Sequence, residues 1–168
     1  DVYEGSPVFV VFYFIVGLKT VFIFIFTRIL FFVFSEFHFY WHWFLIVAAA
    51  GSFLFGGFGA YSQKNLKRFF AYTSLNQLGF ILLGLSSYSF ELAVSSTLFF
   101  LVTYVINNIM FFSIFLCFYN SNSHRPITLL ADLKGLSYFY PWQAIGLTIA
   151  LFSFIGLPPL AGFFSKFF

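Results

Sequence analysis

The chain has 168 residues, of which 61% are hydrophobic and only 8% are charged, and its formal net charge is +3. Because soluble domains carry about 25% charged residues, this composition excludes a soluble globular domain and predicts a membrane protein. The small, scattered charge argues against nucleic-acid binding. The single cysteine, Cys117, excludes disulfides, Cys-x-x-Cys redox pairs and iron–sulfur ligation within this sequence.

Five apolar segments follow in chain order, at residues 8–34, 43–61, 69–87, 92–119 and 141–157. Each is predicted to be a helix, because an open-ended element in lipid must satisfy its own backbone hydrogen bonds. The first four are long enough for a core that takes about 20 helical residues, whereas "GLPPLAG" interrupts the fifth. The sequence therefore predicts an all-α, polytopic transmembrane bundle. It has four full transmembrane helices and one discontinuous helix, in a single membrane domain over residues 1–168.

The loop charges predict an orientation. If the five segments alternate in direction, residues 1–7, 62–68 and 120–140 lie on one side of the membrane. That side holds the following basic residues: Lys64, Lys67, Arg68, Arg125 and Lys134. Glu36 and Glu91 lie on the other side. By the positive-inside rule, we expect the basic side to face the cytoplasm or the mitochondrial matrix.

Lys19 is the only charged residue in the run "FIVGLKTVFIFIF", residues 14–26. Counted from Val8, it lies ~16 Å into a core about 30 Å thick. A charge at that depth costs at least ~2.5–3.5 kcal/mol, so the side chain must face protein or a water-filled cavity. Burial disfavours the protonated amine, and a lysine that gains and loses its proton there would act as a proton relay. The alternative is a structural ion pair with an acidic residue on another helix.

The sequence "FSFIGLPPLAGFFSKFF" carries a second signal. Gly156, Pro158, Pro159 and Gly162 are predicted to break the helix near mid-membrane, because a proline removes a backbone donor and clashes with the preceding turn. Broken helices in membranes tend to line ion or substrate sites, so Lys166 is a second relay candidate. The alternative is a helix end followed by an interfacial lysine.

Other polar side chains within the apolar segments are candidates for a supporting polar axis: Tyr72, Gln77, Asn107 and Asn108. Such groups either hold helices together or keep water between titrating groups, and both interpretations stay open. Gly56, with Ser52 and Ala60 four residues to either side, predicts a close helix contact. His38 and His42 have the spacing of a metal pair, but no third ligand is evident, so no metal site is predicted.

Several motifs occur together in the order and spacing of a known family. They are "DVYEGSP" followed by Lys19, "YSQKNLKRFFAYTSLNQLGF", "LKGL" and "LFSFIGLPPLAGFFSKF". Over its whole length the chain resembles the antiporter-like membrane subunits of respiratory complex I, the NADH:ubiquinone oxidoreductase. The "DVYEGSP" form and the lysine after the broken helix favour the subunit 2 branch of that family.

The resemblance implies that the chain corresponds to helices 8–12 of an antiporter-like, inverted-repeat module. Lys19 would lie on the central hydrophilic axis and Lys166 in the discontinuous helix. Both would relay protons while quinone is reduced in a neighbouring arm. The chain itself would bind no cofactor, because NADH, FMN, iron–sulfur clusters and ubiquinone would be bound elsewhere in the complex. With 32 phenylalanines, typical of an AT-rich organellar gene, we expect the mitochondrial inner membrane, with the bacterial plasma membrane as the alternative.

Two departures from the family affect the expected partners. The sequence begins at Asp1 rather than Met and has no counterpart of the family's earlier helices or of helices 13 and 14. We therefore expect a fragment or a split-gene product, completed by a separate chain and assembled with other membrane-arm subunits and lipid. Gln77 stands where many relatives have a titratable histidine. The rival hypotheses are a piece of a cation/proton antiporter or membrane-bound hydrogenase, and a structural membrane spacer.

Overall fold

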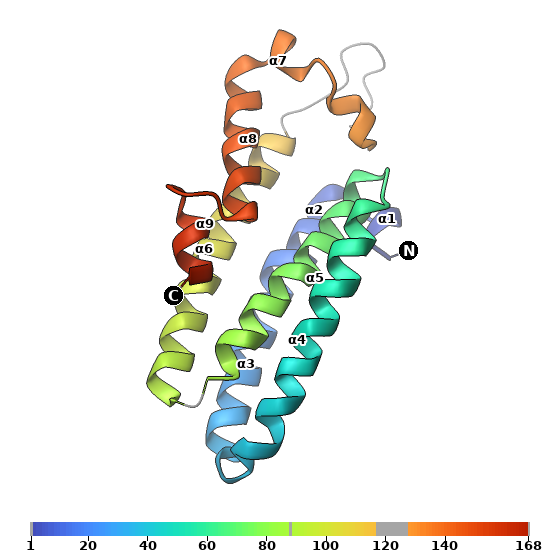
Figure 1. The fold of residues 1–168 in the computed structure, drawn as a ribbon. Helices are drawn as coiled ribbons and strands as arrows, with labels where there is room; N and C mark the ends of the chain where they lie inside the picture. Colours follow the sequence, from blue (N-terminus) through green and yellow to red (C-terminus); the bar gives the residue numbers. More distant parts are fainter. Residues whose placement is uncertain (1, 88, 117–127, 168) are drawn as a thin grey trace.

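The computed structural model describes residues 2–87, 89–116 and 128–167, and these are mainly helical (Figure 1). The short helix α1 (Val2–Gly5) precedes a long helical rod. The rod consists of α2 (Val8–Phe12), the π-helical segment η1 (Tyr13–Leu18), α3 (Lys19–Arg28) and the π-helical segment η2 (Ile29–Val33). The 3₁₀ turn η3 (Ser35–Phe37) leads to α4 (His38–Tyr61), α5 (Leu66–Leu85) and α6 (Phe90–Leu116). The C-terminal part holds the 3₁₀ turn η4 (Leu130–Leu133), α7 (Leu136–Phe139), α8 (Pro141–Ile155) and α9 (Ala161–Phe167).

Within the described ranges, three helical stretches are long and apolar enough to cross a membrane: Val8–Val33, Ser35–Tyr61 and Phe90–Leu116. The helical class is thereby confirmed, and three of the predicted full spans have the length and composition that crossing a membrane needs. α5 has 20 residues, which is the length that a span needs. Lys67, Arg68 and the polar side chains of its first half make it less apolar than the other three.

Two helices begin earlier than the sequence predicted. α4 begins at His38 rather than at residue 43, and the indole of Trp41 in its first turn donates to Phe34 O at 2.9 Å. α5 begins at Leu66 rather than at residue 69, because the Asn65 side chain accepts a hydrogen bond from the backbone of Lys67 and so caps the helix. The predicted end of the fourth segment, with Cys117 and Arg125, lies outside the described residues.

α4 and α5 lie side by side as an antiparallel hairpin (Figure 1). A Cβ atom at Gly56 would lie 2.7 Å from the backbone nitrogen of Asn76, so only glycine permits this approach. A Cβ atom at Gly79 would lie 2.9 Å from the ring of Phe53. Small residues let transmembrane helices approach closely in this way. The close contact predicted for the face that includes Gly56 is confirmed.

The described loops lie at two opposite ends of the helices, as expected if successive segments alternate in direction. At one end, Asn65 donates to the Glu4 carboxylate at 2.9 Å and pairs through an isolated β-bridge with Leu129. At the other end, the rings of Phe31 and Phe90 pack with their centroids 5.2 Å apart. The turn before the rod, the α4–α5 loop and the segment before α7 therefore lie together, and this is the end that carries the basic residues.

The chain leaves the helical conformation between α8 and α9. α8 begins with Pro141, at a position where a missing backbone donor costs nothing. It ends at Gly156, which has a φ of 86°, in the left-handed region that glycine adopts without strain. Pro158 and Pro159 lie in the link that follows. Gly162, expected to be part of the break, lies instead within α9.

Candidate functional site

Lys19 lies near the middle of the rod, at the first position of α3. Its Nζ donates to Ser74 Oγ of α5 at 2.7 Å. Ser74 is buried, and its own hydroxyl donates to Ala71 O at 2.7 Å. The ion pair found among the described residues joins Glu4 to Arg68 and does not include Lys19. The amine of Lys19 therefore faces a neutral hydroxyl rather than a carboxylate.

The turn before Lys19 is the π-helical segment η1. The backbone N–H of Lys19 bonds to Val16 O, and the carbonyl of Ile15 accepts a hydrogen bond from Tyr104 Oη of α6 at 2.9 Å. Tyr104 is buried. A π-helical turn holds one extra residue, and each residue rotates a helix by ~100°. The wide turn therefore sets the direction in which the Lys19 side chain leaves the rod.

Lys166 lies in the last turn of α9 and reaches back to α8. Its Nζ donates to Phe154 O at 2.5 Å and to Ile155 O at 3.2 Å, and it lies 4.6 Å from the centroid of the Phe80 ring. The last carbonyls of a helix have no partner within the helix and carry partial negative charge. The break between α8 and α9 therefore creates the acceptors that hold the amine of Lys166.

Gln77 links α5 to the same point. Its Nε2 donates to Phe154 O at 3.1 Å, and its side chain is 6% exposed. Ser74 and Gln77 are three residues apart on α5, so they lie on one face of that helix. The structure thus brings Lys19, Gln77 and Lys166 together along one face of α5.

The remaining predicted residues have separate surroundings. Asn107 of α6 accepts a hydrogen bond from Ser153 Oγ at 2.9 Å, beside the end of α8. Asn108 is buried and donates to Tyr104 O of its own helix at 2.7 Å. The ring of Tyr72 lies against Gly59 of α4, so it belongs to the α4–α5 contact and not to the group around the lysines.

The histidine pair contacts backbone carbonyls. His38 Nε2 lies 3.4 Å from Ser87 O, and His42 Nδ1 contacts Ser86 O. No group of three or more His, Cys, Asp or Glu side chains that could hold a metal occurs in the part of the chain that the structure describes. The pair therefore joins the start of α4 to the end of α5.

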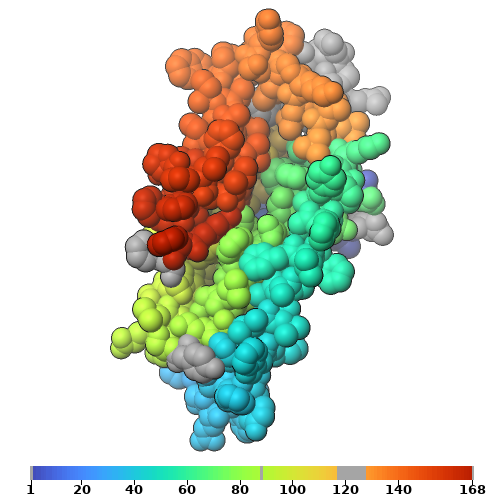
Figure 2. Space-filling view, viewed as in Figure 1, coloured from blue at the N-terminus to red at the C-terminus, as the bar shows by residue number. Residues whose placement is uncertain are grey.

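Two clefts adjoin Lys166. The first has a volume of about 500 Å³ and lies against the N-terminal half of α5. Its polar lining consists of Thr73, Asn76, Gln77 and Lys166. The second has a volume of about 290 Å³ and lies toward the C-terminal end of α5, and its polar lining consists of Ser96, Thr97, Ser165 and Lys166. In Figure 2 the C-terminal residues, in red, lie against the green and yellow-green surface of α5 and α6. Lys166 thus borders a space on each side of it.

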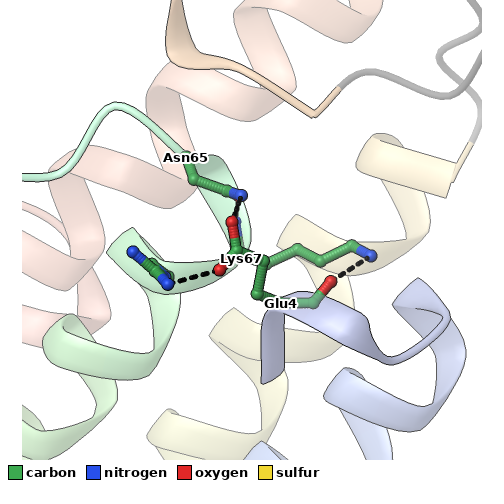
Figure 3. A network of polar contacts seen from close by, with 4 residues as sticks. Glu4, Asn65 and Lys67 are labelled. Carbon is green, nitrogen blue, oxygen red and sulfur yellow. Dashed lines mark hydrogen bonds and ion pairs between the residues drawn. The ribbon is translucent and has the colours of Figure 1, made fainter. Parts of the chain in front are cut away.

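A polar cluster at the basic end joins α1 and the link after it to the start of α5 (Figure 3). Glu4 Oε1 accepts from Asn65 Nδ2 at 2.9 Å, and Glu4 Oε2 pairs with Arg68 at 2.5 Å. Lys67 Nζ donates to Ser6 O at 2.6 Å and to Glu4 O at 3.3 Å. We call these five residues the surface latch. It joins the segment "DVYEGSP" to the first turn of α5. The latch therefore fixes how far along the rod, which carries Lys19, the helix with Ser74 lies.

Three residues of this region were not among the predicted site residues. Ser74 had a usable signal, since a serine three residues before Gln77 shares its helix face. Tyr104 and Ser153 had none, because their partners come from other helices and lie far away in the sequence. Only the packing of the helices reveals them.

A family model described as NADH:quinone oxidoreductase/Mrp antiporter, TM, matches residues 1–168. The chain is also similar to bacterial proteins named NADH-quinone oxidoreductase subunit N. The relative from Pelagibacter ubique is 38% identical over the whole chain, which corresponds to 35% of that protein. The relative from Rhodospirillum rubrum is 35% identical, again over the whole chain and 34% of its own length.

A third relative, subunit N 1 from Rhizobium meliloti, is 35% identical over the whole chain and 35% of its own length. The chain thus spans about a third of the length of the curated relatives it matches. These relatives are bacterial and carry the name subunit N, so they give no support to the expected mitochondrial origin or to the subunit 2 branch. A bacterial plasma membrane fits them.

Proposed function

The chain belongs to the NADH:quinone oxidoreductase/Mrp antiporter transmembrane family, and on that premise we propose that it is part of a proton-translocating membrane subunit of complex I. Lys19 and Lys166 relay protons inside the membrane. The redox chemistry of the NADH:quinone oxidoreductase takes place in other parts of the complex, where NADH, FMN, iron–sulfur clusters and quinone bind. The chain supplies helices 8–12 of an inverted-repeat module, with α5 as the fourth full span.

The observation that carries this proposal is the arrangement of two half-buried amines along one face of α5. Lys19 contacts Ser74, and Lys166 shares the Phe154 carbonyl with Gln77. A lysine in a membrane interior is costly, and its neutral hydroxyl and carbonyl partners leave its proton exchangeable in a way that a fixed ion pair would not.

Proton movement between the lysines requires water as well as side chains. A serine hydroxyl and a glutamine amide donate and accept hydrogen bonds but do not titrate in the physiological range. We expect them to order water between Lys19 and Lys166. The larger cleft, about 500 Å³, adjoins Gln77 and Lys166 and has room for several molecules at that end of the path. A proton leaves the Lys19 ammonium, crosses this water and protonates a neutral Lys166.

The setting of the chain forms part of the proposal. Its partners are other membrane-arm subunits of complex I, lipid, and the polypeptide that supplies the remaining helices of the module, on a separate chain. The membrane is energy-transducing. The bacterial relatives favour a plasma membrane, whereas the 32 phenylalanines favour the mitochondrial inner membrane. The "DVYEGSP" form and Lys166 favour the subunit 2 branch.

Two alternatives lead to different outcomes. A piece of a cation/proton antiporter, which the family description also covers, would not assemble with an NADH-oxidising complex. A structural spacer would hold its lysines in ion pairs, and the Lys19–Ser74 contact argues against that. Native-gel separation of solubilised membranes, with an NADH-oxidation stain and peptide mass spectrometry, distinguishes the first alternative. Peptides of this chain are expected in the NADH-oxidising band together with those of the completing chain.

Lys19→Met and Lys166→Met test the relay itself. Each variant is expected to lose most of the protons translocated per electron in a complex that still assembles and binds NADH. Lys64→Met is the matched control, because Lys64 is an exposed lysine in the loop between α4 and α5. An assembled complex with unchanged proton-to-electron stoichiometry in both membrane variants would overturn the relay.

A further inference from the structure

The hydroxyl of Ser153 forms a different kind of hydrogen bond from other helical hydroxyls nearby. Thr97 and Thr148 donate to carbonyls three or four residues earlier in their own helices, which is the usual arrangement in membrane helices. Ser153 Oγ of α8 instead donates to Asn107 Oδ1 of α6 at 2.9 Å. Ser153 is only 4% exposed. A buried hydroxyl that donates to a side chain of another helix, and not to a carbonyl of its own helix, joins the two helices.

The same oxygen also binds α9. The backbone N–H of Gly162, in the first turn of α9, donates to Ser153 Oγ at 3.2 Å. The first N–H groups of a helix have no partner within the helix, so this bond satisfies one of them in the membrane interior. One hydroxyl thus connects α6, α8 and α9 at the point where the broken helix resumes.

The contact between α8 and α9 at this point leaves no space for a side chain. A Cβ atom at Gly162 would overlap the backbone carbonyl of Ser153. Lys166 lies four residues after Gly162, on the same face of α9. Its amine donates to the carbonyl of Phe154, the residue directly after Ser153. Ser153 therefore lies beside the acceptor of Lys166 and also holds the helix that carries Lys166.

We propose that Ser153 is a positioning residue, which fixes α9 on α8 and α6 so that the Lys166 ammonium meets the Phe154 carbonyl. Ser153 does not touch Lys166 and transfers no proton. Its hydroxyl acts through Asn107 and Gly162. This inference rests on the proposed function, because it requires Lys166 to be a relay.

The test compares Ser153→Ala, Ser153→Thr and Thr148→Ala in the assembled complex. The readout is the number of protons translocated per electron. Ser153→Ala removes the bonds to Asn107 and from Gly162, and it is expected to lower this number clearly below that of Thr148→Ala. Ser153→Thr keeps the hydroxyl and is expected to retain translocation. Thr148→Ala removes a hydroxyl of the same helix that donates to its own Ile145 O, and it is expected to behave as the wild type.

A second pair of variants covers a Ser153→Ala complex that fails to assemble. Asn107→Leu removes the acceptor and leaves Ser153 and its bond from Gly162 in place, so a loss in the same direction, no larger than that of Ser153→Ala, is expected. In the double variant Asn107→Leu/Ser153→Ala, the loss is expected to be no larger than in Ser153→Ala alone, because that substitution already removes the link to Asn107. Additive losses would overturn the inference.

Failure of the inference and failure of the proposed function are distinguishable. If Lys166→Met pumps normally, the relay itself is wrong. If Lys166→Met loses pumping while Ser153→Ala pumps as well as Thr148→Ala, the relay stands and the positioning role of Ser153 is wrong. Loss of translocation in Ser153→Thr equal to that in Ser153→Ala also overturns the role assigned to the hydroxyl.

Discussion

Gln77 and Lys166 donate to the same backbone oxygen, that of Phe154, at 3.1 and 2.5 Å. A carbonyl oxygen has two lone pairs, so it accepts both donors at once. When Lys166 loses its proton and its hold on this oxygen weakens, the amide of Gln77 keeps the carbonyl satisfied. The end of α8 is then not left with an unpaired buried acceptor, which would cost about 1–3 kcal/mol.

The first prediction concerns this shared acceptor. Gln77→Leu removes one donor and leaves Phe154 O dependent on the charged lysine, so we expect Lys166 to be held protonated and translocation per electron to fall. Gln77→His supplies a ring N–H as the donor and is expected to retain most of the proton translocation. Proton uptake and NADH oxidation in the same membranes provide the measurement. Equal translocation in the leucine and histidine variants would show that the donor is unimportant.

The lysines, the interrupted helix and Gln77 could be singled out from the sequence, because each leaves a local mark. A charge in an apolar run or two adjacent prolines can be interpreted without knowledge of the rest of the fold. The partners of Ser153 and Tyr104 could not be predicted, since each lies on a helix distant in the sequence. The π-helical turn before Lys19 was also missed, because no residue type specifies such a turn. The role of Gly162 was misjudged, since a glycine in a break and a glycine in a tight contact look alike in sequence.

The second prediction concerns Tyr104 and the π-helical turn before Lys19. Tyr104→Phe removes the hydroxyl that donates to Ile15 O, so that the carbonyl is left without this donor. We expect the free energy of unfolding to fall by about 1–3 kcal/mol, because a buried acceptor loses its donor. We also expect fewer protons translocated per electron, because Lys19 is no longer held toward Ser74. Tyr61→Phe is the control, since Tyr61 is 94% exposed. Thermal unfolding of the solubilised complex and proton uptake measure the two effects, and a variant equal to the control in both contradicts the assignment.

The third prediction concerns the surface latch. Glu4→Gln removes the charge that pairs with Arg68, in a pair whose side chains are 40% and 42% exposed. Exposed ion pairs contribute little to stability, so we expect the free energy of unfolding to fall by only about 0.5–1 kcal/mol. At 1 M salt, where charges are screened beyond ~3 Å, we expect a smaller difference in stability between the variant and the wild type. Glu36→Gln, at the opposite end of the rod, is the matched control. A loss that does not change with salt would assign the effect to the Asn65 hydrogen bond instead of the ion pair.

The last prediction tests the α4–α5 contact that holds Ser74 and Gln77 in place. Gly56 and Gly57 are adjacent on α4, yet a Cβ atom at Gly56 would lie 2.7 Å from the backbone of Asn76, whereas at Gly57 it would meet nothing within 4 Å. Gly56→Ala forces α5 away from α4 and is expected to lower the free energy of unfolding by about 1–3 kcal/mol. Gly57→Ala is expected to be neutral or to stabilise the helix by up to about 1 kcal/mol.

Thermal unfolding of the assembled complex separates the two alanine variants, and both raise the intrinsic helix propensity of α4 equally. A lower midpoint in Gly56→Ala alone therefore reports the contact and not the helix. Because Ser74 and Gln77 lie on α5, the displaced helix is also expected to lengthen the Lys19–Ser74 contact and to reduce translocation. Equal midpoints and equal translocation in both variants would mean that α5 is held in register by other contacts, with the surface latch as the next candidate.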